Sequence, residues 1–451
     1  MSVSDYHAPP YRCPIAVPAE SKKQRFGQRK VTVGVRPSHE GAMMSVKRIL
    51  VLGGGFAGLW SAVGAVRKLD ELGYGPDAVE VTLVNRDGYH NIRVRNYEPD
   101  LTSVRVPLDD VLGPIGVARV EGEVASIDLV GQTVMVNTES KPRVLPYDRL
   151  VLALGSQLPR PNIPRLAEHA FDVDTYNGAV QLNTHLQSLS DRPESPGQFT
   201  VLVVGAGLTE IEAATEMPGK LRTILAQSGM NRSFRVILAD HNPQVGSDMG
   251  EDARPVIEEA LAALGIDTRL GIDIVAVTPS SVTLKSGEEI ATATVVWCAG
   301  MRANPLTRLF PVEHDRSGRV PVDEFMRLKG ISHVFAAGDA AWAMMDDTHV
   351  SVMSCQHGRP MRRFAGHNVV CDLLGLPMLP LRIEWYVTVL DLGPWGAVYT
   401  EGWDRHVVAK GEAAKRTKQI INCQRIYPPL SGNRQEILVA AAPLVQHPPK
   451  V

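Results

Sequence analysis

The sequence predicts an α/β protein with two βαβ units of the same type, followed by a smaller C-terminal part. In residues 47–85, an apolar strand (47–52) is followed by a glycine-rich turn (53–58), a helix (59–72) and a second strand (79–85). The same succession occupies residues 199–240. An apolar strand that runs into glycines and then into a helical pattern is typical of a βαβ unit, so we expect two Rossmann-like domains.

Length and composition agree with a folded multidomain protein. At about 150 residues per domain, a chain of 451 residues predicts two or three domains. The formal net charge of -2 argues against a nucleic-acid partner. No apolar run reaches the roughly 18 residues that cross a membrane, and no apolar leader opens the chain, so we expect a cytoplasmic protein. The five cysteines lack zinc-type spacing, and no metal site is expected.

The two ends of the chain differ from its middle. Residues 1–43 are rich in proline, lysine and arginine and show no periodicity, which predicts a disordered extension. From residue 376 the helical pattern weakens, and aromatic residues and glycines become frequent. Residues 376–451 are therefore expected to form a small β or α+β appendage.

The first glycine turn has the spacing that binds a dinucleotide. Gly53 permits a tight turn, Gly55 lets the backbone approach a pyrophosphate, and Gly58 lets the helix pack close to the strand. The start of the helix adds unpaired N–H groups and partial positive charge, which attract phosphate. Because the motif follows a strand and opens a helix, dinucleotide binding is favoured over a purely structural turn.

The second strand of the first unit ends at Asn85, and Arg86 follows it. An acid at this position usually accepts hydrogen bonds from the ribose of the nucleotide. Asn85 can also bond the ribose, although without charge assistance, so Asn85 and Arg86 are candidate cofactor-binding residues. The alternative is that Asn85 only caps the end of its strand.

Further motifs lie between residues 147 and 342. They are YDRLVLALGS (147–156), VLVVGAGLTEIEAATEM (201–217), VVWCAGMRANPL (295–306), GRVPVDEFMR (318–327) and VFAAGDAAW (334–342). Together with GGGFAG (53–58), they resemble the two-dinucleotide-binding flavoproteins of the pyridine nucleotide-disulfide oxidoreductase superfamily. The resemblance is greatest to the type II NADH dehydrogenases.

This resemblance implies a division of the chain into domains. Residues 44–165 would form the first part of an FAD-binding domain, and residues 301–375 its second part. Residues 166–300 would form an NAD(P)H-binding domain between them. The run of polar residues, proline and glycine at 191–197 is a suitable linker into the second glycine turn.

The resemblance also implies individual FAD contacts. Asp339, in the Gly338-Asp339 pair, matches the family's aspartate that bonds the ribityl chain of FAD. The alternative role for Asp339 is to cap the N-terminus of a helix. Val124 and Gly300 are further expected cofactor contacts.

For the nicotinamide cofactor, the resemblance points to Gly205 and Gly207 in the second turn and to Asp240 at the end of the return strand. An acid at that strand end accepts from the ribose hydroxyls of NAD and repels a 2′-phosphate. His241 rather than an arginine follows Asp240. NADH is therefore expected, with NADPH the less favoured cofactor.

The second turn departs from the family at Glu210, where relatives usually have glycine. A carboxylate at about 6 Å from a phosphate, with an effective dielectric of about 20, is repelled by about 3 kcal/mol. The partial positive charge at a helix N-terminus stabilises a carboxylate by only about 0.3–1 kcal/mol. We therefore hypothesise that Glu210 weakens NADH binding if its side chain points at the phosphates.

Three residues are candidate catalytic groups. Glu212 matches an acid that in relatives lies near the contact between nicotinamide and flavin; the alternative is a carboxylate on a helix surface. Gln356 matches the first glutamine of the family's A-Q-x-A-x-Q-Q-G segment. Its neighbour His357 is a candidate proton source at the flavin edge. The paired glutamines at the quinone site are replaced by Pro360 and Met361.

The function implied is that of an FAD-dependent oxidoreductase, which takes a hydride from NAD(P)H and passes electrons to a second acceptor, a quinone or another molecule. The alternatives are a reductase of a small electron-carrier protein or of a biosynthetic intermediate, and a flavin-binding sensor with little turnover. Disulfide reductases are disfavoured because residues 44–297 contain no cysteine. The basic segment 410–425 is either a solvated helix face over a core stripe or a peripheral membrane contact.

Overall fold

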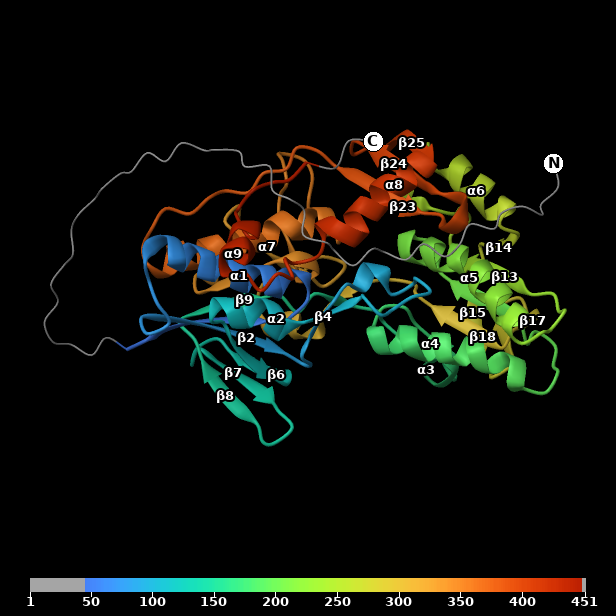
Figure 1. Ribbon diagram of the computed structural model, residues 1–451, viewed down its shortest axis with the longest axis horizontal. Coiled ribbons are helices and arrows are strands. Elements are labelled where there is room, and N and C mark those ends of the chain that lie inside the picture. The colour runs from blue at the N-terminus through green and yellow to red at the C-terminus, as the bar shows by residue number, and fades with distance from the viewer. Residues whose placement is uncertain (1–44, 448–451) are drawn as a thin grey trace, which may run out of the picture.

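The computed structural model describes residues 45–447 as two α/β units joined by a third part (Figure 1). The first unit holds the blue N-terminal strands and the orange helix α7, and the second unit, in green and yellow, lies at the other end. The extension expected at residues 1–43 lies outside the described residues.

A five-stranded parallel sheet, in the order β21-β9-β1-β2-β5, forms the centre of the first unit. Its strands are β1 (Lys47–Leu52), β2 (Val79–Asn85), β5 (Ala118–Glu121), β9 (Arg149–Leu152) and β21 (Val334–Ala336). Helices α1 (Phe56–Leu72) and α7 (Cys355–Leu373) pack against each other and share one apolar core with this sheet. Because β21 and α7 follow the second unit in the chain, two separated segments build the first unit.

The second unit has its own five-stranded parallel sheet, in the order β11-β18-β12-β13-β14. Its strands are β11 (Ala170–Phe171), β12 (Thr200–Val204), β13 (Arg235–Asp240), β14 (Ile266–Leu270) and β18 (Thr294–Trp297), and its longer helices are α4 (Tyr176–Ser188), α5 (Leu208–Gln227) and α6 (Arg254–Ala263). Each glycine turn follows a strand inside its sheet, at the carboxyl edge where α/β proteins bind ligands.

Each unit also carries a small antiparallel sheet. The first is β6 (Glu123–Asp128), β7 (Thr133–Asn137) and β8 (Arg143–Pro146); the second is β15 (Ile274–Val277), β16 (Ser281–Leu284) and β17 (Glu289–Ala291). A hairpin of β3 (Tyr89–Asn91) and β4 (Arg105–Pro107) leads into α2 (Leu108–Leu112). These additions leave the two parallel sheets as the frame of the molecule.

The appendage contacts both units. It contains β23 (Val387–Asp391), β24 (Ala397–Glu401), β25 (His406–Gly411), α8 (Glu412–Ile420), a π-helical turn (Ile421–Arg425) and α9 (Arg434–Ala440). Leu390 and Val398 of its sheet join the apolar core of the second unit. Ile437 and Leu438 of α9 join the core of the first unit, where α9 packs on α1. The appendage thus ties the two units together.

The expected fold class, α/β with two Rossmann-like units and a C-terminal appendage, is confirmed. The strands predicted at 47–52 and 79–85 have those bounds. Helix α1 begins at Phe56 rather than at Leu59, because Gly55 is the extended residue that precedes its first turn.

The basic segment 410–425 forms the end of β25, α8 and the π-helical turn. Ala414 and Thr417 of α8 are buried. Lys415 and Lys418 also point inward and pair with Asp391 and Glu212. Two of the basic side chains on this segment are therefore used in the protein interior.

Candidate functional site

One cavity of about 1690 Å³ runs between the two units and is bordered by both glycine turns. The candidate cofactor residues that line it are Gly53, Gly55, Asn85, Arg86, Val124, Gly205, Gly207, Asp240, Gly300, Gly338 and Asp339. Glu212 and Gln356 line it as well. The sequence motifs of both units therefore meet at one space large enough for more than one ligand.

The first turn leaves room beside its backbone. Gly53 has φ +104°, and a Cβ there would lie 2.5 Å from the carbonyl oxygen of Ala153, so glycine is required. A Cβ on Gly58 would lie 1.7 Å from the oxygen of Gly53, so Gly58 acts by close packing and does not line the cavity. A Cβ on Gly55 would meet nothing within 4 Å, and this open space is what a pyrophosphate needs.

The strand after each helix holds its glycine turn in the same way. The N–H of Gly54 donates to Oδ1 of Asn85 (2.7 Å), and the N–H of Ala206 donates to Oδ2 of Asp240 (2.5 Å). Asn85 also donates to the carbonyl oxygen of Asp87 (2.9 Å). The strand-end role considered for Asn85 is therefore present, and a ribose contact by Asn85 or Asp240 stays a prediction.

Glu210 folds back over the second turn. A Cβ built on Gly205 would lie 2.8 Å from its Oε1, and one on Gly207 would lie 3.0 Å from its Oε2. Burial is the main cause that raises the pKa of Glu210 to about 8; its own backbone N–H opposes this rise, and the carboxylates of Asp248 and Asp240 contribute to it. The carboxyl group thus occupies the place where the first turn is open.

Glu212 lies on the same helix but faces the appendage. It is 7 % exposed, so the alternative of a carboxylate on a helix surface is wrong. Its Oε1 accepts from Nζ of Lys418 (2.7 Å) and from the N–H of Asp391 (3.1 Å). Burial raises the pKa of Glu212, whereas the Lys418 ammonium lowers it. The pair places one carboxylate and one ammonium on the cavity wall.

The Gly338-Asp339 turn lies against the start of α1. A Cβ on Gly338 would lie 2.8 Å from the Cβ of Ala57. Oδ2 of Asp339 accepts from the hydroxyl of Ser156 (2.7 Å). Asp339 lies inside a short 3₁₀ turn (Gly338–Ala340) that has no side-chain cap, so the helix N-cap alternative is wrong.

Gln356 uses its amide within the protein. Its Nε2 donates to the carbonyl oxygen of Trp385 (3.0 Å), and its Oε1 accepts from the N–H of Val387 (2.8 Å). These bonds fix the start of β23 beside the first turn of α7. Gln356 therefore positions a wall of the cavity, and any contact with a substrate would be made by its second amide hydrogen or by the remaining lone pair of its carbonyl oxygen.

His357 does not have the position expected for a proton source. It is fully buried and does not line the cavity. Its Nδ1 accepts from the N–H of Val352 (2.9 Å), and its Nε2 has no hydrogen-bond partner among the described residues. Burial lowers its pKa to about 4, so the ring is neutral at physiological pH. The prediction failed because the helical rotation of α7 turns this side chain away from the cavity.

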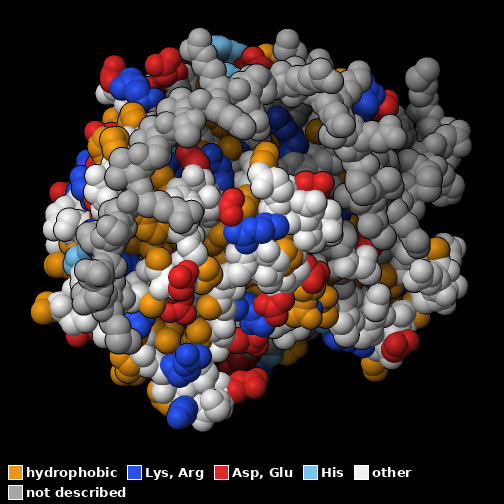
Figure 2. Space-filling model, turned by 60° about the vertical axis from the view of Figure 1, so that its left-hand side comes forward, with side chains coloured by type: hydrophobic (Ala, Val, Ile, Leu, Met, Phe, Trp, Pro, Cys, Tyr) orange, Lys and Arg blue, Asp and Glu red, His pale blue; other side chains and the backbone are white. Residues whose placement is uncertain are grey.

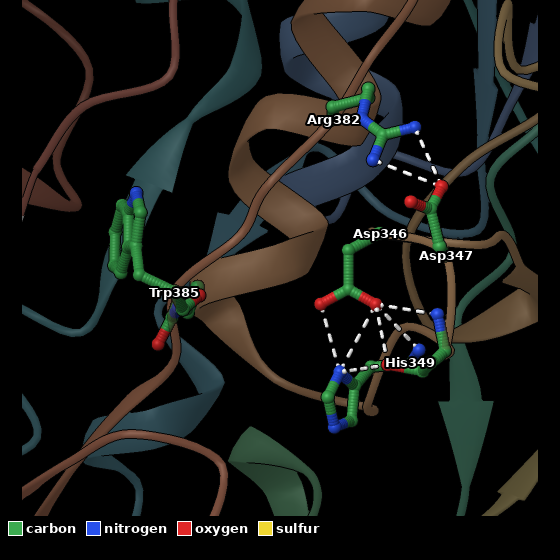
Figure 3. Close-up of polar contacts among 7 residues, drawn as sticks. Asp346, Asp347, His349, Arg382 and Trp385 are labelled. Atoms are coloured by element: carbon green, nitrogen blue, oxygen red, sulfur yellow. Dashed lines mark hydrogen bonds and ion pairs between the residues drawn. The ribbon is translucent and has the colours of Figure 1, made fainter.

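His357 belongs instead to a stack of rings that ends at the protein surface. Trp403 stacks on His357 (5.6 Å between ring centroids) and on His349 (4.1 Å). Figure 3 shows how the loop of His349 is held: Asp346 accepts from the N–H of His349 (2.7 Å), and Asp347 accepts from both Nη atoms of Arg382 (3.1 Å each). Trp385, on the cavity wall, lies apart from this loop.

Two basic residues on the cavity wall were missed by the sequence reasoning. Lys418 was considered only as part of the basic segment 410–425. The sequence gives no sign that it contacts Glu212, because the two residues are 206 positions apart. Arg362 stands where the resembled dehydrogenases have the glycine of A-Q-x-A-x-Q-Q-G, and this departure was a usable signal. It is 1 % exposed, and its Nε and Nη1 have no hydrogen-bond partner among the described residues.

The open space at Gly55 and the unpartnered Arg362 are suited to an anionic dinucleotide, so the residues present fit FAD. On the face shown in Figure 2, acidic and basic side chains are interspersed with apolar ones. Among residues 45–447, no helix is both long and apolar enough to cross a membrane.

Comparisons with known proteins agree with this geometry. Residues 47–360 match the family model described as pyridine nucleotide-disulphide oxidoreductase. An NADH dehydrogenase-like protein of Mycobacterium tuberculosis is 58% identical over 402 residues, which cover 89% of this chain and 100% of the relative. A demethylphylloquinone reductase of Synechocystis is 28% identical over 361 residues, 78% of this chain and 86% of the relative.

Among solved structures, the NDH2 of Plasmodium falciparum in complex with NADH has the same fold, with a TM-score of 0.68 at 12% identity. The likeness covers 88% of this chain and 97% of that chain. The family match extends over most of the chain and includes both glycine turns. The protein belongs to the pyridine nucleotide-disulphide oxidoreductase family, as an FAD-dependent NAD(P)H oxidoreductase that resembles the type II NADH dehydrogenases.

Proposed function

We propose that the chain oxidises NADH through bound FAD and passes the electrons to a quinone. The observation that carries the proposal is one continuous cavity, which joins both glycine turns to an apolar region beside α7. That region is lined by Trp385, Val387, Ile421, Leu444 and Val445. The flat apolar ring of a quinone suits such a lining. The name of one relative, the demethylphylloquinone reductase of Synechocystis, says that it reduces a quinone.

Bound FAD supplies the ring that accepts a hydride from NADH and releases the electrons to the acceptor. The residues of the chain align the two nucleotides and keep water away from their contact. Gly53, Gly55, Gly58, Gly338 and Asp339 would hold FAD. The second turn, with Gly205, Gly207 and Asp240, would hold NADH, and the acid at Asp240 favours NADH over NADPH.

Reduction of a quinone also consumes two protons, and Lys418 is placed to supply one. Its Nζ donates to Glu212 and to the carbonyl oxygen of Val389 (3.0 Å), which leaves one of its three hydrogens for a ligand. Burial alone would lower the pKa of Lys418, but the Glu212 carboxylate raises it above the usual value. The side chain therefore keeps its proton at neutral pH until a more basic oxygen lies beside it.

The acceptor is tested by steady-state oxidation of NADH with a water-soluble quinone, with a ferredoxin and with ferricyanide. We expect turnover with the quinone, and a KM for quinone that rises roughly tenfold in Trp385→Ala, because an aromatic wall of the site is lost. The ferricyanide rate should stay unchanged. Tyr74→Ala, an exposed aromatic residue outside the cavity, is the matched control. Turnover with ferredoxin but not with quinone would reject this function.

A quinone dissolved in lipid would require contact with a membrane surface, and the C-terminal part offers exposed apolar side chains for it. Val439 on α9 is 60 % exposed, and Leu444 next to the cavity is 62 % exposed. We expect cosedimentation with vesicles of anionic lipid that is weakened in the double variant Val439→Glu, Leu444→Glu. Val130→Glu, at a site 96 % exposed on the β6–β7 turn, should bind as the wild type does.

A further inference from the structure

Arg362, a buried arginine on the cavity wall, has no negative partner among residues 45–447. Arg362 lies on α7, and the guanidinium is 5.3 Å from the ring centre of Phe56 and 5.6 Å from that of Trp60. The hydroxyl of Ser61 donates to the carbonyl oxygen of Arg362 (3.1 Å), which fixes this turn of α7 against α1. The side chain is therefore held at the start of α1.

The charged groups nearest to Arg362 make its position unfavourable. Burial lowers its pKa well below the usual value, and the positive charges of Arg359 and Arg363 lower it further. Arg359 is engaged elsewhere, since its Nη2 donates to the carbonyl oxygen of Arg425 (2.8 Å) and to Gln446 (2.7 Å). A buried guanidinium without an anion is strongly unfavourable, so a missing ligand is the natural source of the compensating charge.

The surroundings of Arg362 indicate which ligand group would reach it. One helical turn earlier on α7, a Cβ on Gly358 would lie 3.7 Å from the Cα of Gly338. Gly338 in turn contacts Ala57 in the first turn of α1. Arg362 thus stands where α7 meets the N-terminus of α1, and that N-terminus is the expected seat of a pyrophosphate.

We propose that Arg362 is a cofactor-binding residue that pairs with the pyrophosphate of FAD. The proposal rests on FAD being the cofactor of the proposed function. A guanidinium presents parallel N–H groups that match two phosphate oxygens, and such a pair needs no carboxylate from the protein. Arg363, the next residue, is buried on the same cavity wall, but its guanidinium lies over Trp60 and not over Phe56, the first residue of α1.

The test measures FAD binding to the apoprotein by quenching of flavin fluorescence, without turnover. Arg362→Gln should raise the Kd for FAD roughly 10- to 100-fold, as for the loss of one charged hydrogen-bonded pair. The Kd of Arg362→Lys should lie between those of the wild type and of Arg362→Gln, because lysine keeps the positive charge but lacks the parallel N–H groups of a guanidinium. Arg363→Gln, the matched control, should change the Kd less than about threefold.

Two further measurements separate this role from others. Thermal unfolding of apo Arg362→Gln should occur at the wild-type temperature or above it, because an unpaired buried charge is removed. A fall in apoprotein stability together with unchanged FAD affinity would mean a structural role and overturn the proposal. The flavin midpoint potential of the Gln variant should equal that of the wild type.

A lowered midpoint potential with unchanged FAD affinity would place Arg362 against the flavin ring and overturn the assignment to the pyrophosphate. Equal losses of FAD affinity in Arg362→Gln and Arg363→Gln would indicate that the positive charge of α7 attracts FAD without a specific pair. This result would also overturn the proposal. Failure of the wild-type apoprotein to bind FAD would reject the proposed function itself, so the two failures are distinguishable.

Discussion

The glycine turns at residues 53–58 and 205–210 have nearly the same backbone but differ in the side chains that lie beside them. Gly53 and Gly205 have φ +104° and +108°, and a polar side chain from the following strand holds each turn. The first turn is open at Gly55 and has the unpaired Arg362 nearby. The second turn is covered by the Glu210 carboxyl group, with Asp248 next to it.

This difference shows that the backbone and the side chains make separate contributions to nucleotide binding. The backbone makes both turns capable of receiving a pyrophosphate. The side chains around the first turn attract an anion, whereas those around the second repel one once they are ionised. We therefore expect a tightly held nucleotide at the first turn and a weakly held, exchangeable one at the second.

The largest effects should come from substitutions of the glycines in the first turn. One should lower apoprotein stability, and another should weaken FAD binding. Gly58→Ala places a methyl group 1.7 Å from a backbone oxygen, so the apoprotein should unfold roughly 5–10 °C lower. Gly55→Ala clashes with nothing in the protein and should leave apoprotein stability unchanged. It should instead weaken FAD binding roughly 100-fold. Equal stability of both apo variants would contradict this assignment of roles.

Substitution of Glu210 tests whether charge or occupancy weakens the second turn. At pH 9, Glu210→Gln should lower the KM for NADH by up to roughly 100-fold, because it removes a repulsion of about 3 kcal/mol and keeps the volume. Glu210→Gly removes both charge and volume. If only the glycine variant improves binding, steric occupancy is the cause; if neither does, Glu210 moves aside when NADH binds.

The pH dependence of NADH binding follows from the same group. An acid whose pKa is raised to about 8 is neutral below that pH and negative above it. The KM for NADH should therefore be nearly constant below pH 8 and rise by up to about tenfold per pH unit above it. Other ionisable groups face the same space, namely Asp248, Asp240, Glu212 and Cys298. The pH profile of Glu210→Gln shows how much of the effect comes from these groups. A profile that still rises in this variant assigns the effect to another group.

The smallest effect should come from the end of β13. Asp240→Asn keeps an acceptor for the N–H of Ala206 but removes the charge that repels a 2′-phosphate. We expect the ratio of kcat/KM for NADPH to that for NADH to rise several-fold. Asn85→Asp, the reverse change in the first unit, should leave that ratio unaltered because it faces the other nucleotide.

The parts of this fold that depend on local rules could be predicted from the sequence. Strand bounds, both glycine turns and the acid at Asp240 follow from apolar runs, turn chemistry and family motifs. The environment of Glu212 could not be predicted, because its partner Lys418 lies on a distant helix. The direction of His357 was also missed, since a position in a helical sequence does not by itself fix which face of the helix meets the cofactor.

The order of the strands in the first sheet has a consequence for synthesis on the ribosome. Residues 170–297 contain every strand of the second sheet, so that unit can close as soon as it has left the exit tunnel. The first sheet must wait for β21 at residues 334–336 and for the helix behind it. The N-terminal strands therefore emerge first but finish last, against the usual N-to-C order of domain folding.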